Sequence, residues 1–344
     1  MITAGANGAQ ALIEVRDLKK HFPIIKGVFS RPAGTVYAVD GVSFHIDPGE
    51  TLGLVGESGC GKSTVGRTLL KLLEPTAGRI IVRGEDISGH DHEQMLPYRR
   101  QMQMIYQDPY ASLNPRMSAG EIVSEPFAIH RVATGGERQD RVAALFERVG
   151  LRPELMRAYP HEFSGGQRQR IGIARALALS PEFVVSDEPV SALDVSIQAQ
   201  IINLLMDLRD ELKLSYLLVS HDLTVVQHIS QRIAVMYLGR IVEIADKVSL
   251  FEMPLHPYSE ALLSAIPMPK AGARRRQRVI LKGDLPSPIN PPSGCHFHTR
   301  CPYVHMRCRR EAPQLREVMP THWTACHLHD AGATLPLRAP PASR

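Results

Sequence analysis

The sequence predicts an α/β fold in which a parallel sheet forms the core, accompanied by an antiparallel β layer and a helical subdomain. Residues 51–55, 183–186 and 216–219 are apolar almost throughout, as expected of parallel strands that helices cover on both faces. Residues 13–50 alternate in the manner of antiparallel strands that end at a turn. From residue 118 to about residue 160 the apolar period becomes helical, which indicates a helical insertion.

The N-terminal part predicts the antiparallel layer. Strands are expected at Ile13–Val15, Val36–Val39 and Val42–Ile46, and the last of them ends at the turn Asp47–Glu50. The stretch Pro23–Gly34 is interpreted as a loop inserted between the first two strands.

The remaining core elements follow in order along the chain. Further strands are expected at Arg79–Gly84 and Met102–Tyr106. Helices are expected at Val65–Leu73, Gln167–Leu179 and Val195–Leu212, and from about Leu223. Within the insertion, helical spacing relates Val142, Leu145, Phe146 and Val149.

The most specific motif lies between the strand at 51–55 and the helix that follows it. It fits the phosphate-binding pattern G-x-x-x-x-G-K-[ST] and consists of Gly56, Glu57, Ser58, Gly59, Cys60, Gly61, Lys62, Ser63 and Thr64. Glycines let backbone N–H groups approach a phosphate, and the helix N-terminus adds its positive dipole. Lys62 can reach the β- and γ-phosphates of a nucleotide, and the Ser63 hydroxyl can ligate Mg²⁺.

Two carboxylates follow the apolar run at 183–186. A carboxylate at the end of a strand beside a phosphate loop can hold a water-coordinated Mg²⁺, and Asp187 is the candidate. Glu188 can polarise the attacking water as a general base. Taken alone, the pair could equally be an acidic turn, because Pro189 follows it.

A second anion site is expected where a helix begins after Phe163. It consists of Ser164, Gly165, Gly166 and Gln167. One nucleotide does not need two such helix ends from the same subunit. The economical explanation is a head-to-tail dimer, in which each nucleotide lies between Lys62 of one subunit and Ser164 of the other.

In combination, these motifs resemble those of the ATP-binding subunits of ATP-binding-cassette (ABC) transporters over about residues 12–266. The resemblance implies a P-loop NTPase fold of the ABC ATPase type, with ATP and Mg²⁺ as cofactors and ATP hydrolysis coupled to transport. It implies that Gly56–Thr64 is the Walker A loop, Phe163–Gln167 the signature motif, with Phe in place of the commoner Leu, and Phe183–Glu188 the Walker B strand.

The same resemblance implies roles for single residues. Gln107 would contact Mg²⁺ and water and signal to the membrane subunit, and His221 would contact the γ-phosphate. The segment that ends at Asp194 would be the D-loop. Phe22 most resembles the aromatic residue that stacks on adenine, and Tyr37 is the alternative.

Three segments are similar to those of oligopeptide/dipeptide importer ATPases, and more to the second, F-type ATPase of such importers: Gln107–Pro115, Met253–Ser259 and Leu262–Pro267. The similarity implies three kinds of partner: a second, homologous ATPase subunit, two permeases and an extracytoplasmic peptide-binding protein. The helical segment at 118–160 would receive the coupling helices of the permeases. The cargo stays open, because glutathione, nickel chelates and cationic peptides would be served by the same kind of subunit.

Four of the five cysteines gather in the last fifth of the chain: Cys295, Cys301, Cys308 and Cys326. In a chain of the reducing cytosol such a group favours metal over disulfides. The spacing has no tight C-x₂₋₄-C knuckle, which argues against zinc. The resemblance implies a [4Fe–4S] cluster on these cysteines, while zinc and unligated thiols remain alternatives. Nearby histidines keep mixed ligation open, and they are His296, His298, His305, His322 and His327.

These features divide the chain into three parts. Residues 12–250 are expected to form the nucleotide-binding domain, with its helical subdomain at about 110–165. Residues 251–330 are expected to form an importer-type, Cys-rich C-terminal extension, and residues 331–344 a disordered tail.

Composition favours a peripheral protein on the cytoplasmic face of the inner membrane, attached through permeases. No apolar run approaches the length of a membrane-spanning helix, and residues 1–10 lack the features of a secretory signal. The formal net charge of +5 permits a soluble ABC ATPase that acts on nucleic acid or ribosomes. The single cassette without sustained heptads argues against it, so no nucleic-acid partner is expected. The basic run Arg274–Arg278 is interpreted as a solvated linker.

Overall fold

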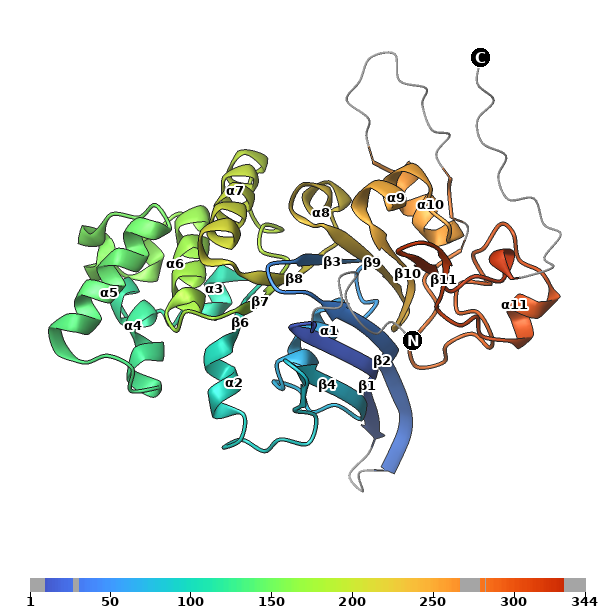
Figure 1. The fold of residues 1–344 in the computed structure, drawn as a ribbon, viewed down its shortest axis with the longest axis horizontal. Coiled ribbons are helices and arrows are strands. Elements are labelled where there is room, and N and C mark those ends of the chain that lie inside the picture. Colours follow the sequence, from blue (N-terminus) through green and yellow to red (C-terminus); the bar gives the residue numbers. More distant parts are fainter. Residues whose placement is uncertain (1–9, 27–30, 267–278, 282, 331–344) are drawn as a thin grey trace, which may run out of the picture.

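The described residues form two β-sheets. Helices lie at both ends of the molecule and on one face of the central sheet (Figure 1). The structure is a computed structural model that describes residues 10–26, 31–266, 279–281 and 283–330. The expected linker Arg274–Arg278 and the expected tail at 331–344 lie outside the described residues. Within those ranges, no helix has the length and apolar character that crossing a bilayer would require.

The central sheet has eight strands in the order β11-β12-β10-β9-β3-β8-β7-β6. Their bounds are β3 Thr51–Val55, β6 Met102–Ile105, β7 Phe183–Asp187, β8 Ser215–Ser220, β9 Arg232–Tyr237, β10 Arg240–Asp246, β11 Arg316–Met319 and β12 His322–Thr324. The strands from β9 to β6 pair in parallel, so their carboxyl ends meet at one edge of the sheet. β3, β7 and β8 are buried at every residue, which confirms that strands apolar throughout lie between covered faces.

The second sheet is antiparallel, in the order β2-β1-β4-β5. Its strands are β1 Ile13–Lys26, β2 Arg31–Ile46, β4 Ala77–Val82 and β5 Glu85–Asp86. A shared core lies between this sheet and the central one, where Val65 and Leu69 of α1 (Lys62–Leu69) pack with residues of both sheets. In Figure 1 the antiparallel sheet lies below the central sheet, and α7, α8 and α9 lie above it.

The interpretation of Pro23–Gly34 as an inserted loop is wrong for most of its length. β1 continues to Lys26 and β2 already begins at Arg31, and the two pair in register, with Phe22 opposite Val36 and Ile24 opposite Gly34. Beyond Lys19, β1 pairs with β2 alone, so this ribbon extends past the rest of the sheet.

The helical subdomain forms one end of the molecule (Figure 1). It comprises α3 Pro109–Ser112, α4 Ala119–Ile129, α5 Gly135–Arg148, η1 Pro153–Arg157, η2 Pro160–Glu162 and α6 Gly165–Leu177. Ser118 begins α4 with a capping box to Glu121. Phe127 of α4 and Val142 and Phe146 of α5 are buried in a second hydrophobic core, which also includes residues of the central sheet. Their burial confirms the predicted helical period.

The other helices cover the central sheet and the opposite end. They are α2 Leu96–Gln101, α7 Val195–Leu212, α8 Leu223–Ile229, α9 Lys247–Glu252, α10 Pro257–Ser264, α11 Met306–Arg310 and η3 His327–His329. The predicted bounds of the helix at Val195–Leu212 are confirmed.

The Cys-rich extension is joined to the central sheet. β12 pairs with β10, placing Thr324 opposite Glu243 and Trp323 opposite Ile244, and β11 pairs with β12 at the edge. The last strands of the described residues therefore extend the same sheet whose strand β3 leads into the phosphate loop.

Candidate nucleotide-binding site

The phosphate loop connects β3 to α1 at the carboxyl edge of the central sheet. Two of its glycines leave no room for a side chain. A Cβ on Gly56 would lie 2.2 Å from the carbonyl oxygen of Met236, and a Cβ on Gly61 would lie 2.0 Å from that of Ala38. Gly61 also has a left-handed backbone, with φ of 107°. The loop is thus closely packed on its outer side, against β9 and β2.

Lys62 is buried and its ammonium is directed back into the loop. Nζ donates to the carbonyl oxygens of Gly56, at 2.8 Å, and Glu57, at 3.0 Å. An ammonium in this position places a positive charge beside any phosphate that the loop amides bind.

Ser63 and Asp187 form the second part of the site. Ser63 Oγ donates to Asp187 Oδ1 at 2.7 Å, across a gap between α1 and the end of β7. Asp187 is fully buried, and burial raises the pKa of its carboxyl group despite the Ser63 hydrogen bond. Its Oδ2 has no hydrogen-bond partner among the described residues, and the Arg67 guanidinium lies 3.9 Å away. A hydroxyl and a partly unsatisfied carboxylate are oxygen ligands of the kind Mg²⁺ takes, so the residues fit this ion.

Glu188 is the point where three strand ends meet. Gln107 Nε2, after β6, donates to Glu188 Oε2 at 2.9 Å. His221 Nδ1, after β8, lies 3.1 Å from Oε1. Glu188 itself follows β7 in a left-handed conformation with φ of 44°, and its N–H donates to Val219 O at 2.9 Å. The predicted residues at these strand ends are therefore brought together around one carboxylate.

The predicted signature segment, Phe163–Gln167, spans the beginning of α6 and does not adjoin the phosphate loop in the sequence. Ser164 caps α6, accepting from Gln167 N, and the Gln167 side chain accepts in turn from Ser164 N at 2.9 Å. α6 lies with α4 and α5, apart from α1 (Figure 1). A Cβ on Gly166 would lie 2.6 Å from Ile197 of α7, so the segment packs against the helix that follows Asp194. Asp194 and Val195 are exposed.

The two candidate adenine-stacking residues lie on the neighbouring strands β1 and β2. The Lys20 ammonium lies 4.9 Å from the centroid of the Phe22 ring. The Tyr37 ring meets His21 edge-on at 4.7 Å. Both Phe22 and Tyr37 are half-buried, and the choice between them stays a prediction.

The four C-terminal cysteines come together in the fold without forming a complete ligand set. Cys295 N donates to Cys308 O at 2.8 Å. Burial, reinforced by the neighbouring thiols, raises the pKa of Cys301 and of Cys326 to about 12. Among the described residues, however, no three His, Cys, Asp or Glu side chains are arranged so that they could hold a metal ion.

Two residues at the loop were not predicted from the sequence. The Tyr258 hydroxyl accepts from Glu57 N at 2.9 Å, and Arg300 Nη1 donates to the Glu57 carboxylate at 2.8 Å. Both belong to segments far from the loop in the chain, and no motif relates them to it. Only the folded structure could identify them.

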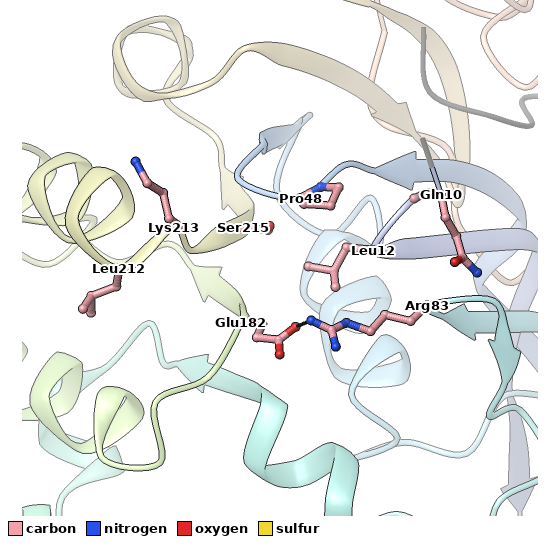
Figure 2. Close-up of a pocket in the computed structure, with 9 residues that line it drawn as sticks. Gln10, Leu12, Pro48, Arg83, Glu182, Leu212, Lys213 and Ser215 are labelled. Atoms are coloured by element: carbon pink, nitrogen blue, oxygen red, sulfur yellow. Dashed lines mark hydrogen bonds and ion pairs between the residues drawn. The ribbon is translucent and has the colours of Figure 1, made fainter. Parts of the chain in front are cut away.

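Two cavities lie away from these strand ends. One, of about 430 Å³, is lined by Leu12, Pro48, Glu182 and Ser215, near the amino ends of β3, β7 and β8 (Figure 2). An ion pair between Arg83 and Glu182 crosses it (Figure 2). The other cavity, of about 590 Å³, is lined by β1, β10 and the extension. The first cavity lies at the opposite edge of the sheet from the phosphate loop, so it is not part of the nucleotide site.

Known proteins share this combination of motifs and fold. Residues 39–191 match the family described as ABC transporter, and residues 242–308 match the family described as oligopeptide/dipeptide transporter, C-terminal region. The chain is 55% identical over 326 residues to the oligopeptide transport ATP-binding protein AppF of Bacillus subtilis, covering 94% of this chain and 99% of that protein. It is 54% identical over 320 residues to the putative oligopeptide transport ATP-binding protein YkfD of the same organism, covering 92% and 95%.

A solved structure shares the cassette fold. The dimeric ATP-binding cassette MJ0796, in a post-hydrolysis state with ADP and Pi, is 28% identical with a TM-score of 0.62, over 68% of this chain and 98% of that chain. On the motifs, the fold and these similarities, the chain belongs to the family of ABC transporter ATP-binding proteins, with the C-terminal region of the oligopeptide/dipeptide transporters.

Proposed function

We propose that this chain is the ATP-hydrolysing subunit that powers import of di- and oligopeptides through an ABC transporter. The observation that carries the proposal is the meeting of Gln107, Glu188 and His221 at one edge of the sheet, together with the importer-type C-terminal region. The names of AppF and YkfD support peptides as the cargo class.

In the proposed reaction, the loop amides and Lys62 bind the β- and γ-phosphates of ATP. A water attacks the γ-phosphorus in line with the leaving ADP oxygen, and Glu188 accepts the proton of that water as the P–O bond breaks. His221 and Gln107, which both contact Glu188 here, orient the carboxylate and the water. Mg²⁺, held by Ser63, Gln107 and Asp187, would neutralise phosphate charge.

The ATP-binding site would be completed by residues of a second subunit. Ser164, Gly165, Gly166 and Gln167 lie on α6, which is grouped with the helical subdomain, so they would serve the nucleotide of a head-to-tail partner. The dimeric state of MJ0796 supports this arrangement. We infer that the partner is a homologous ATPase and that the exposed Asp194 lies at the interface.

The subunit would act at the cytoplasmic face of the membrane, on two permeases fed by an extracytoplasmic peptide-binding protein. The helical subdomain is the expected receiving surface. Uptake of labelled di- and oligopeptides by cells that carry this chain or its Glu188→Gln variant tests the proposal. Loss of uptake of one size class in the variant supports it. Unchanged peptide uptake would remove the peptide assignment, and glutathione, nickel chelates and cationic peptides would be tried next.

We further propose that Cys295, Cys301, Cys308 and Cys326 hold a [4Fe–4S] cluster. The grouping of the thiols supports the proposal, since neighbouring cysteines contribute to the raised pKa of Cys301 and of Cys326. Since no three His, Cys, Asp or Glu side chains among the described residues are arranged to hold a metal ion, the proposal rests on the grouping of the four thiols alone. Protein purified without oxygen should contain iron and sulfide, which Cys308→Ser should lower and Cys60→Ser should not. Iron-free protein, or zinc in its place, would overturn the proposal.

A further inference from the structure

The second residue of the phosphate loop, Glu57, is bound through three of its groups. Its carbonyl oxygen accepts from Lys62 Nζ at 3.0 Å. Its N–H donates to the Tyr258 hydroxyl at 2.9 Å, and its carboxylate oxygens lie 2.8 and 3.1 Å from Arg300 Nη1. Two of these contacts come from the C-terminal part of the chain, which the cassette motifs do not include.

Arg300 lies largely buried next to the phosphate loop, where it pairs with Glu57. Its side chain is 10% exposed, and its N–H donates to Phe297 O at 3.0 Å. The buried ring of Phe297 packs against Tyr237 at 5.2 Å and Tyr258 at 5.5 Å between centroids. Tyr258 is fully buried, so its hydroxyl has a fixed position at the loop.

A second set of contacts ties the same segment to the loop through the turn between β9 and β10. His296 Nδ1 lies 3.1 Å from Leu238 O. The next residue, Gly239, donates its N–H to Cys60 O at 2.9 Å. The segment from Cys295 to Cys301 is thus connected to both ends of the loop sequence Glu57–Cys60.

The charge of Glu57 gives these contacts a consequence for ATP. A loop that binds a polyanion is a costly place for a carboxylate, because like charges repel and the repulsion is strongest where water is excluded. Arg300 places a permanent positive charge against that carboxylate. Without Arg300, the Glu57 carboxylate would bring an uncompensated negative charge to the loop that binds the phosphates.

We propose that Arg300 and Tyr258 are positioning residues for ATP binding: Arg300 neutralises Glu57, and Tyr258 fixes the loop backbone at the same residue. The C-terminal extension therefore sets the ATP affinity of the cassette. The proposal rests on the assignment of Gly56–Thr64 as the ATP-phosphate loop, and it goes beyond the transport function.

A charge-suppression experiment tests the role of Arg300. The full chain is compared as wild type, Arg300→Gln, Glu57→Gln and the double variant, with ATP affinity measured by equilibrium binding and kcat and KM by phosphate release. Arg300→Gln should raise the Kd and KM for ATP about tenfold and leave kcat nearly unchanged. Adding Glu57→Gln should bring the affinity back to within about threefold of the Glu57→Gln single variant.

Salt provides a readout that a merely structural role would not give. The Glu57 side chain is 29% exposed, so salt of about 1 M, where the Debye length is about 3 Å, should screen part of its repulsion toward the phosphates and reduce the defect of Arg300→Gln in part. Arg300→Lys should restore most of the affinity. Arg310→Gln is the matched control, because Arg310 is exposed in the same extension and its side chain has no hydrogen bond or ion pair among the described residues.

Tyr258→Phe tests the backbone contact separately and should raise the ATP KM several-fold without the salt dependence. The proposal is overturned if Arg300→Gln binds ATP like wild type, or if Glu57→Gln fails to suppress its defect. If Arg300→Gln does not fold, Glu57→Gln alone still tests the charge, because it should bind ATP at least as tightly as the wild type, and weaker binding would overturn the proposal. A wild-type chain that binds no ATP would instead overturn the assignment of the loop.

Discussion

The Glu188 carboxylate and the His221 ring lie 3.1 Å apart, from Oε1 to Nδ1, at the ends of the adjacent strands β7 and β8. The neighbouring oxygen of the same carboxylate accepts from Gln107 at the end of β6. Because β7 lies between β6 and β8, its end is the one position that both neighbours can reach. The geometry makes Glu188 the centre of the predicted catalytic group.

Glu188→Gln is expected to lower kcat for ATP hydrolysis by at least about 100-fold, because the amide cannot accept a proton from water. ATP binding should persist, since the phosphate contacts come from Lys62 and the loop. Phosphate release and ATP binding are measured on the same preparation. Unchanged turnover would remove Glu188 from the mechanism, while loss of both activities would indicate misfolding.

Asp187→Asn should separate stability from Mg²⁺ binding. The buried carboxylate has one oxygen without a hydrogen bond among the described residues, so a neutral amide should raise the free energy of unfolding of the nucleotide-free chain by on the order of 1 kcal/mol. The rise in Tm that Mg²⁺ and ATP produce together should be lost. Scanning fluorimetry with and without Mg²⁺–ATP measures both effects, and an Mg²⁺-dependent shift of wild-type size in the variant would contradict the role of Asp187.

His322→Ala should strongly destabilise the chain. His322 Nε2 lies 2.6 Å from Glu243 Oε1, and both side chains are buried. The change leaves the Glu243 carboxylate with only the N–H groups of Leu255 and His256, and the expected cost is about 3 kcal/mol. Urea denaturation measures it. Adding Glu243→Gln should recover part of the loss, and additive losses would show that the pair is not coupled.

The stability of the chain should fall between pH 6.5 and pH 4 partly through His256. Burial lowers the pKa of this residue from 6.5 to about 4, opposed by Glu243. In that range the unfolded chain binds a proton that the folded chain does not, so the folded state loses up to about 3 kcal/mol on acidification, and the contribution is intact above pH 6.5.

His256→Asn isolates this contribution. The His256 ring accepts from Tyr258 N as the cap of α10, and Asn can accept the same bond without titrating. Denaturant midpoints measured at several pH values should fall less steeply in the variant. Parallel curves for the two proteins would assign the acid sensitivity to other groups.

Much of the site could be predicted because the polar residues at the carboxyl ends of parallel strands lie at the same edge of the sheet. Gln107, Glu188 and His221 each follow an apolar strand, and their meeting is a consequence of strand order. Tyr258 and Arg300 could not be predicted. They lie about 200 and 240 positions beyond Glu57, and their contacts depend on how the extension packs.

The fold was predicted less well where residue preferences disagree with their surroundings. From the sequence, the stretch Pro23–Gly34 is interpreted as a loop, yet its two prolines, Pro23 and Pro32, lie in paired strands. β2 is at the edge of its sheet, and β1 has one neighbour beyond Lys19, so a proline without an N–H can face the open side. β11 and β12 are too short, with 4 and 3 residues, to give a strand pattern, and β12 becomes a strand because β10 offers it a partner.

The pairing of β12 with β10 limits how this protein can be shortened. A cassette cut after residue 250 would keep β10 but uncover its row of backbone donors and acceptors, beside apolar residues such as Ile244. An uncovered flat edge of this kind recruits strands from other molecules. We therefore expect a protein truncated at this point to aggregate, even with every predicted nucleotide-binding residue in place.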